Sequence, residues 1–476
     1  MGHMVWIPHG SRLGASFATA DIKILALEGF VCDVAAALAL GNSLAAAVRS
    51  AVRQHPAAAK AFNLPDNDAV LEACFALSDN LTFPNETLPA VMTFERQGAT
   101  MSLKLDSLLA RDVHSLLALC GAARSTAEQI HSAIDDQTRA LFESLLAKNI
   151  VVEEPPPLSL RAPTVARPGV TRMQHAGLFY RGHSAGILVD PHFHSSYEPD
   201  GLRDNFLRSQ FEGLVDAILI SHSHQDHWHL PTLMTFPSDT LIVVPKVPRA
   251  TILCPDFAAT LRALGFTRVV ALGWSEPPLL VGDLEVHALP FYGEQPLLTD
   301  VPRHPDLRNH GNTYVVRHKS YTSWFLIDSG NDWAGSMAQV AHEAKSRFGR
   351  IDLLLSNLRE FPIYTPQYIT GGHYWLALTP DQLRRFTSMA NDVITLGPGG
   401  VAEVCHIVQA RKFLPYAHWW GEIGAPPDPQ ERFLIDQLRS SLADLGATTE
   451  IVPWCIGDSY LPVSEQEGVL AKLQAH

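Results

Sequence analysis

A short apolar run followed at once by metal-binding side chains is the stretch that most constrains this chain. Residues 214–230 read LVDAILISHSHQDHWHL, in which a buried-strand pattern leads into four histidines and an aspartate. Side chains two apart on an extended chain share a face, so His222 and His224 can point toward one ion. Asp226 and His227, on the following turn, can serve a second ion. Imidazole and carboxylate donors suit zinc, iron or manganese, so a strand end is predicted to carry a site for two metals.

The part of the chain around this stretch alternates short strand patterns with helical ones. From residue 173 on, runs such as TLIVVPK, RVVALG, LEVHALPFYGE and SWFLIDSG are separated by helical patterns such as DFAATLRALG and GSMAQVAHEAKSRFG. Strands interleaved with helices are typical of layered α/β domains whose sheets are buried on both faces. We therefore expect residues 173–476 to form one α/β catalytic domain.

The first 150 residues have a different pattern, which predicts a mainly helical domain. Residues 33–54 and 125–149 carry apolar side chains at three-to-four spacing, and Ser125 with Glu128 fits a capping box. A two-strand element is expected at 90–105, with Gln97-Gly98 at its turn. Residues 151–172 hold five prolines and are expected to be a linker between the two domains.

Composition narrows the functional class. The chain has 476 residues, a formal net charge of −13, 46% hydrophobic and 18% charged residues. This acidic balance argues against nucleic acid or an anionic membrane as the main partner. No apolar run reaches the roughly 18 residues that span a bilayer. The 6 cysteines are scattered without CxxC pairs, so we expect reduced thiols and a cytoplasmic protein, with an oligomer permitted.

The HxHxDH loop after a strand resembles that of the metallo-β-lactamase superfamily, over about residues 173–476. The resemblance implies an αβ/βα sandwich in which later strand ends supply the remaining ligands. It further implies that Asp190, in ILVDPHF, supports the metal loop. The ligand set that it implies is His222, His224, Asp226, His227, Glu294 in FYGE, Asp328 in FLIDSG as the bridge, and His418 in PYAHWW.

Two of these implied positions have rivals in the sequence. His310, in RNHGNTYVV, is an alternative to Glu294, although it precedes a strand whereas this ligand should follow one; otherwise it would lie beside the site as support. His373, in TGGHYW, is an alternative to His418. Its surroundings resemble a loop of the lactonase-like branch, where this histidine lies beside the metals and contributes to catalysis together with the ligands. Three further histidines are expected at buried or rim positions: His192, His194 and His229.

A carboxylate at the third ligand position favours iron or manganese over zinc, because three anionic oxygen donors make the site harder. One branch of the superfamily is similar in this respect, the diiron β-hydroxylase of chloramphenicol biosynthesis, which also carries an extra N-terminal domain. The resemblance implies two irons, O₂ as co-substrate, an external electron donor, and oxygenation of an amino-acid or peptide unit, free or on a carrier protein. The pocket is expected to include aromatic residues next to the ligands: Tyr292, Tyr374, Trp375, Trp419 and Trp420.

Other interpretations of the same residues stay open at this point. The same ligands would also serve a dinuclear zinc or manganese hydrolase of an ester, lactone, amide or phosphodiester. A scaffold protein with a decayed site is the non-enzymatic alternative. The segment HSLLALCGAARSTAEQIHSAIDDQ, from residue 114, is similar to the winged-helix unit of peptide-chaperone domains, which implies docking of a peptide or carrier protein. The alternative without a docking role is a helical domain that only packs against the sandwich.

Overall fold

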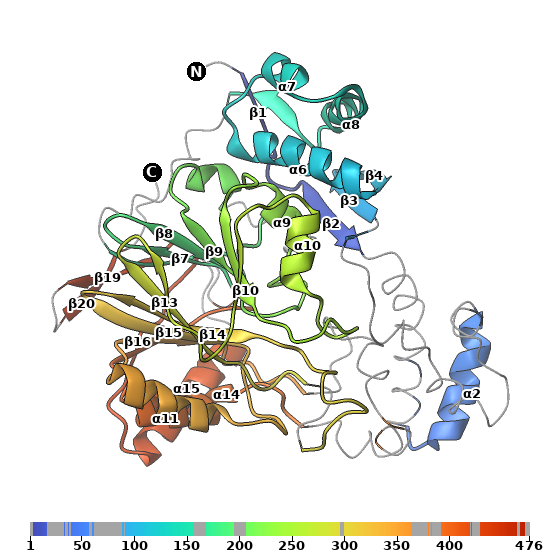
Figure 1. The fold of residues 1–476 in the computed structure, drawn as a ribbon. Coiled ribbons are helices and arrows are strands. Elements are labelled where there is room, and N and C mark those ends of the chain that lie inside the picture. The colour runs from blue at the N-terminus through green and yellow to red at the C-terminus, as the bar shows by residue number, and fades with distance from the viewer. Residues whose placement is uncertain are drawn as a thin grey trace.

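Two β-sheets stacked face to face form the centre of the molecule, with helices on their outer sides (Figure 1). A computed structural model of the chain describes the following residues: 3–16, 33, 37, 40–56, 60, 88–89, 91–155, 168–194, 206–295, 299–362, 379, 382, 392–418, 420, 429–463 and 467–471.

The first sheet has eight strands in the order β11-β10-β9-β8-β7-β6-β19-β20. Strands β8 to β11 run parallel to one another, and all the other pairs in this sheet are antiparallel. Its strands are β6 (Gly169–Arg172), β7 (Leu178–Arg181), β8 (Gly186–Val189), β9 (Ala217–Leu219), β10 (Leu241–Pro245), β11 (Val269–Leu272), β19 (Ser459–Val463) and β20 (Glu467–Ala471). Strand β6 begins at Gly169, so the sandwich starts inside the segment expected to be a linker; residues 156–167 lie outside the described part.

The second sheet has seven strands in the order β12-β13-β14-β15-β16-β17-β18. Strands β15 to β18 are parallel, and β12 to β15 are antiparallel. Its strands are β12 (Leu279–Val281), β13 (Leu284–Pro290), β14 (Asn312–His318), β15 (Tyr321–Ile327), β16 (Leu353–Ser356), β17 (Lys412–Pro415) and β18 (Glu450–Ile451).

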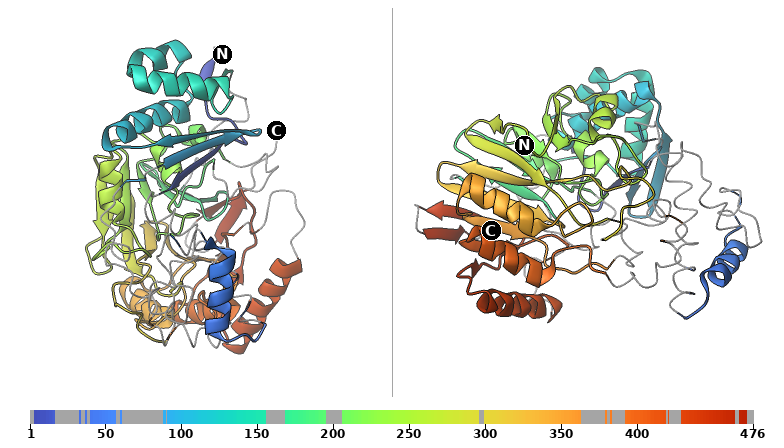
Figure 2. Two further views of the ribbon diagram at one scale, coloured as in Figure 1. Left: turned by 90° about the vertical axis from the view of Figure 1, so that its right-hand side faces the viewer. Right: turned by 60° about the horizontal axis from the view of Figure 1, so that its bottom comes forward.

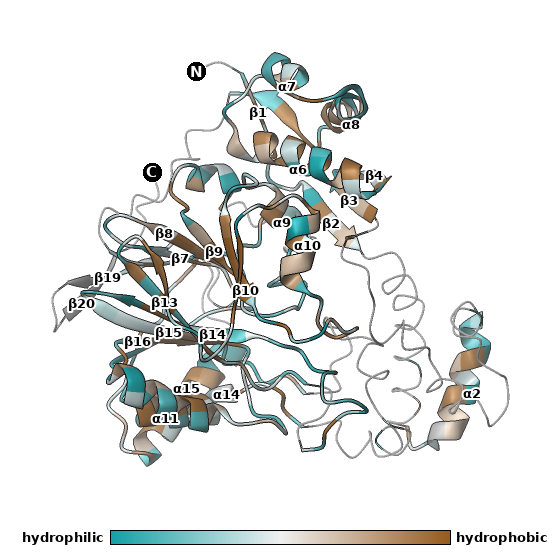
Figure 3. Cartoon of the chain, viewed as in Figure 1, coloured by the Kyte–Doolittle hydropathy of each residue, from teal (hydrophilic) through white to brown (hydrophobic). Residues whose placement is uncertain are grey.

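Apolar strands are the reason the sheets stack. Side chains of both inner faces, among them Ile187, Leu219, Phe325 and Leu355, form one buried core. The opposite face of the second sheet packs on α11 (Met337–Phe348), α14 (Gly397–Val408) and α15 (Pro429–Asp444), as Figure 2 shows. Figure 3 shows the matching pattern, with apolar residues along β8 to β10 and hydrophilic residues on the outward-facing side of α11. Because both faces are covered, the central strands are apolar on both sides.

The outer face of the first sheet packs on α9 (Leu230–Met234), α10 (Phe257–Ala263) and the N-terminal region, through one continuous core. With the second sheet's helices, this completes the αβ/βα sandwich. The remaining elements are β1 (Met4–Trp6), β2 (Arg12–Ser16), α2 (Leu44–Gln54), β3 (Val91–Arg96), β4 (Ala99–Lys104), α6 (Ser107–Ala122), α7 (Ala127–Ala133), α8 (Asp136–Ala147), β5 (Val152–Glu154) and the 3₁₀ helix η2 (Arg208–Phe211).

The N-terminal region differs from expectation in three details. The β3–β4 hairpin forms with its turn at Gln97-Gly98, but β2 from far upstream pairs with it as a third strand. The helix expected over 125–149 is two helices, α7 and α8, because Asp135 caps a new helix by accepting the backbone N–H of Thr138. The capping box is formed by Thr126 and Gln129. Strand β2 also contacts α9, so this region is tied to the metal loop.

Among the helices that the structure describes, none is both long and apolar enough to cross a membrane. The described cysteines Cys120, Cys254, Cys405 and Cys455 are free thiols, as expected.

Candidate metal centre

The metal loop follows β9 directly and is held by Asp190, which follows the neighbouring parallel strand β8. Asp190 accepts hydrogen bonds from the backbone N–H and hydroxyl of Ser221, at 2.8 and 2.5 Å. Its Oδ2 also lies 3.0 Å from Nδ1 of His227. Asp190 is fully buried. Its backbone is in the left-handed region (φ 40°), a strained conformation that concentrates at functional sites. It therefore fixes both ends of the loop, as expected for a supporting residue.

Three donor atoms converge at one side of the loop. Nε2 of His222 lies 3.1 Å from Nδ1 of His224, and Oε2 of Glu294 lies 3.1 and 2.9 Å from these two nitrogens. Metal–ligand bonds of about 2.1 Å at right angles separate adjacent donors by about 3 Å, so this triangle has the dimensions of one face of a metal site. All three residues are buried.

The backbone after β13 is shaped to present Glu294. Gly293 (φ 85°) has no room for a side chain, because a Cβ there would lie 2.4 Å from the backbone nitrogen of Gly330. The N–H of Gly293 donates to Asp332, and the N–H of Glu294 donates to the carbonyl oxygen of Ile394. Glu294 itself takes a left-handed conformation (φ 49°). The strand end thus holds its carboxylate toward the two histidines.

A second set of donors lies on the other side of Asp328, which follows β15. Oδ2 of Asp328 is 2.9 Å from Nε2 of His227, and its Oδ1 is 2.8 Å from Nε2 of His418. Oδ2 of Asp226 lies 3.5 Å from Nε2 of His227 and 3.9 Å from Nδ1 of His418. Because Asp328 also groups with His222 and His227, its carboxylate lies where it can be shared between two ions.

The electrostatics of this cluster suit cations. Burial opposes ionisation of Asp226 and Asp328, yet the surrounding histidines hold the pKa of each carboxyl well below its ordinary value. Burial likewise opposes protonation of His227, but Asp226, Asp190 and Asp328 raise its pKa well above the ordinary value. Three ionised carboxylates in one buried cluster are costly without matching positive charge.

One buried atom shows that the residues fit a metal. Oδ1 of Asp226 has no hydrogen-bond partner among the described residues. A buried polar atom without a partner is unfavourable, and a bound cation would satisfy this oxygen. The donor set of four histidines and three carboxylates therefore matches two ions that share Asp328.

Some predicted residues lie elsewhere or outside the described part. His310 is partly buried and belongs to none of the three candidate metal groups among the described residues. Tyr292 packs on Trp274 and lies beside the guanidinium of Arg308. Trp420 is buried in the core beneath the second sheet. His192, His194 and His229 are buried, as expected. The predictions that fall outside the described residues are His373, Tyr374, Trp375 and Trp419.

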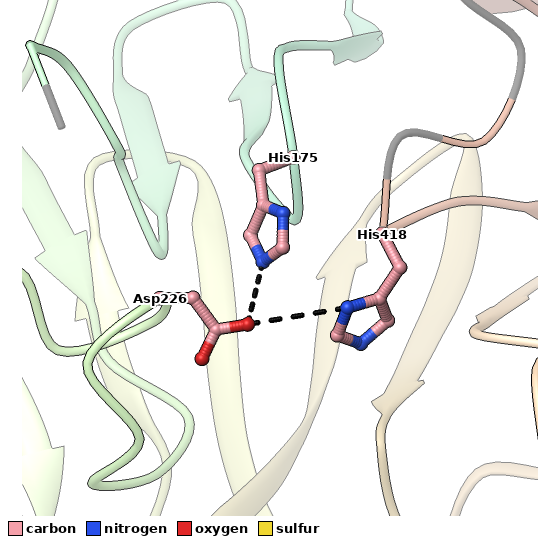
Figure 4. A group of neighbouring side chains, drawn as sticks. All are labelled: His175, Asp226 and His418. Carbon is pink, nitrogen blue, oxygen red and sulfur yellow. Dashed lines mark hydrogen bonds and ion pairs between the residues drawn. The ribbon is translucent and has the colours of Figure 1, made fainter. Parts of the chain in front are cut away.

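One residue of the cluster was not expected. His175, in the turn between β6 and β7, places Nε2 2.8 Å from Oδ2 of Asp226, and it groups with Asp226 and His418 (Figure 4). Its local sequence, MQHAG, carries no metal motif. Only the packing of β6 and β7 beside β8 and β9 brings it to the site.

The fold has a known counterpart. The crystal structure of CmlA, a diiron β-hydroxylase from Streptomyces venezuelae, matches with a TM-score of 0.57 at 17% identity, over 95% of this chain and 99% of that one. A mutant of the CmlA β-hydroxylase matches with a TM-score of 0.58 at 17% identity, over 94% of this chain and 98% of that one. A two-sheet sandwich with metal-binding side chains at its strand ends decides the fold. The chain has the metallo-β-lactamase fold.

A curated protein is also similar in sequence. The 4-amino-L-phenylalanyl-(CmlP-peptidyl-carrier-protein) 3-hydroxylase of Streptomyces venezuelae is 34% identical over 184 residues, 37% of this chain. The matched segment spans 33% of that relative's length. A scan of protein families found none whose model matches the chain.

Proposed function

We propose that this chain is a dinuclear iron oxygenase that hydroxylates an amino-acid unit held on a carrier protein, working in the cytoplasm with an external electron donor. The observation that carries the proposal is the carboxylate of Glu294, which forms a compact triangle with His222 and His224. The matched relative's name describes the hydroxylation of an aminophenylalanyl group on a peptidyl carrier protein, which supports this choice of reaction and substrate class.

In this proposal the first ion is held by His222, His224 and Glu294, and the second by Asp226, His227 and His418. Asp328 is shared between them. Three carboxylates among seven ligands favour iron over zinc, since anionic oxygens stabilise the higher oxidation states of iron. Two bound irons supply the activation of O₂, so that one oxygen atom enters a substrate C–H bond and the other leaves as water with two electrons and two protons.

The protein's own groups keep the site dry and ordered. All seven proposed ligands are buried, which excludes bulk water from the reacting atoms. The ring of Phe291 stacks on His222 at 4.9 Å, and the ring of Phe361 lies 4.7 Å from that of His418. These contacts fix the two histidines at opposite ends of the cluster, so that the order of the donors is set before any metal binds.

The N-terminal region is the proposed docking surface for the carrier protein. Residues 3–16 and 91–155 contain a helical unit, α6 to α8, flanked by the β1–β5 pair. Leu108 on α6 exposes 72% of its surface. In this proposal it is one contact point for the partner. Leu108→Glu is expected to weaken carrier-protein binding while the chain still binds metal.

Metal analysis tests the proposal. Protein from iron-supplemented medium is expected to contain two irons per chain and to show visible absorption from the ferric pair. Glu294→Ala should lose iron and oxygenation, whereas the matched variant His310→Ala, at a partly buried histidine outside the cluster, should keep both. A colourless protein with two zincs that hydrolyses simple esters would contradict the oxygenase proposal. Loss of iron in His310→Ala with retention in Glu294→Ala would contradict the ligand assignment.

A further inference from the structure

His175 contacts Asp226, in the half of the metal cluster that also contains His227 and His418. Its Nε2 lies 2.8 Å from Oδ2 of Asp226, and both side chains are nearly inaccessible, at 3% and 5% exposed. A carboxylate oxygen only accepts hydrogen bonds, so Nε2 of His175 carries the hydrogen and donates it. Figure 4 shows the imidazoles of His175 and His418 both directed at this oxygen.

The fold holds the imidazole of His175 without help from a metal. Its ring packs at 5.0 Å from that of His418, 5.5 Å from His227 and 5.3 Å from His192. Its backbone is in the left-handed region (φ 50°), inside a tight turn closed by hydrogen bonds between residues 173 and 177. A side chain in such a position has little freedom to move away from Asp226.

The same turn is anchored on its other side by Gln174. The buried amide of Gln174 donates to the carbonyl oxygens of His192 and Phe206, and accepts the N–H of Phe206. These bonds attach the turn to the segment that follows Asp190. The β6–β7 turn is therefore held against the segment that follows Asp190. This attachment fixes the direction of the hydrogen bond from His175.

Asp226 has reason to need this hydrogen bond. Its carboxylate can rotate about the last side-chain torsion, and its Oδ1 has no hydrogen-bond partner among the residues described here. The donors of the first ion, in contrast, lie within 3.1 Å of one another. Residues that hydrogen-bond to metal-ligating carboxylates orient them, and their loss costs about 10- to 100-fold in metal affinity.

We infer that His175 is a positioning residue for the second ion: it holds the Asp226 carboxylate in the orientation that binds metal. This rests on the dinuclear site of the proposed function, but not on iron being the metal or on oxygen chemistry. Two consequences follow. Loss of the hydrogen bond weakens the second ion and leaves the first in place. A side chain that donates from the same distance restores the second ion.

A pair of amide variants tests the geometry. The amide nitrogen of glutamine extends about as far from the backbone as Nε2, whereas that of asparagine reaches only as far as Nδ1. Metal-free protein is titrated anaerobically with Fe(II) against a chromophoric chelator. Wild type and His175→Gln should bind two irons, whereas His175→Asn should bind one normally and the second about 10- to 100-fold more weakly. After exposure to O₂, only the first two should show the absorption of a ferric pair.

Controls separate a positioning role from damage to the fold. His310→Asn, at a partly buried histidine outside the cluster, should bind both irons as wild type does. The melting temperatures of metal-free His175→Gln and His175→Asn should agree closely, since both variants lose the packing of the His175 ring. Equal iron binding by His175→Asn and wild type would overturn the role of His175 alone, as would a His175→Gln variant as weak as His175→Asn. A wild type that binds fewer than two ions would overturn the dinuclear site itself.

Discussion

The two halves of the metal cluster are built in different ways. The half around His222, His224 and Glu294 comes from one loop and one strand end, and its donor atoms lie 2.9 to 3.1 Å apart. The half around Asp226, His227 and His418 draws on β15, β17 and the β6–β7 turn as well, with distances from 2.8 to 3.9 Å. The first half draws on two elements, whereas the second depends on several. We therefore expect the second ion to be the more easily lost.

Loss of the shared carboxylate of Asp328 should weaken both ions rather than the second ion alone. Asp328 contacts His227 and His418 and groups with His222, so Asp328→Ala removes a donor from both ions. We expect metal content below one ion per chain and a loss of activity of more than about 100-fold, beyond the effect of losing a supporting residue. Elemental analysis after gel filtration measures this. Retention of one tightly bound ion would show that Asp328 does not bridge.

Variants of the terminal histidines should separate the halves. His418→Ala is expected to leave one ion bound at the first half, while His222→Ala should weaken the first ion and disturb Asp328 as well. The matched variant His373→Ala should keep two ions, because His418 is the proposed ligand. Fe(II) titration of each variant measures the outcome. If His373→Ala lost the second ion and His418→Ala kept it, the two residues would exchange roles.

Weakening the support that Asp190 gives to the metal loop should have a smaller effect on metal binding. Asp190→Asn keeps the size of the side chain but removes the charge that faces Nδ1 of His227 and weakens the bond from Ser221. We expect the second ion to bind about 10-fold more weakly, within the range for residues that orient a ligand. The first ion should change less. Equal weakening of both would mean that Asp190 supports the whole loop rather than His227.

Acid should test the packing of the segment after Asp190 against the N-terminal region. Burial, with His9 and His229 nearby, lowers the pKa of His194 to about 3, and the carbonyl of His194 accepts the N–H of Leu13 in β2. The unfolded chain protonates this histidine below about pH 6.5 while the folded chain resists, so stability is full above that pH and falls as the pH drops toward 3. At pH 5 the loss is about 2 kcal/mol.

Denaturant unfolding of metal-free protein at pH 7.5 and 5.0 measures this effect. His194→Gln should show a smaller difference between the two pH values than wild type does, since glutamine does not titrate. An unchanged difference would assign the acid sensitivity to other buried groups.

Some of the site could be foreseen because each ligand follows a strand that is visible in the sequence. ILIS leads to His222, ALPFYGE ends in Glu294, FLIDSG contains Asp328 and LPYAH ends in His418. Parallel and neighbouring strand ends meet at one edge of a sandwich, and the resemblance to the metallo-β-lactamase superfamily selected Glu294, Asp328 and His418 among the polar residues at those ends. The α/β layers followed from the same alternation.

The remainder depended on contacts between distant segments. His175 reaches Asp226 across 51 positions of sequence, and its own turn has no motif. Strand β2 pairs with β3 although the two are separated by a long stretch of chain, and no local pattern fixes that partner. The break between α7 and α8 was missed because apolar spacing continues across it, while the cap of Asp135 decides the structure.

Anomalous diffraction at the iron absorption edge, from crystals of iron-loaded protein, tests the central claim most directly. The account predicts two iron peaks on either side of the Asp328 carboxylate. One should lie within bonding distance of His222, His224 and Glu294, and the other within bonding distance of Asp226, His227 and His418. A single peak, signal at the zinc edge instead, or a Glu294 side chain turned away from the metal would contradict it.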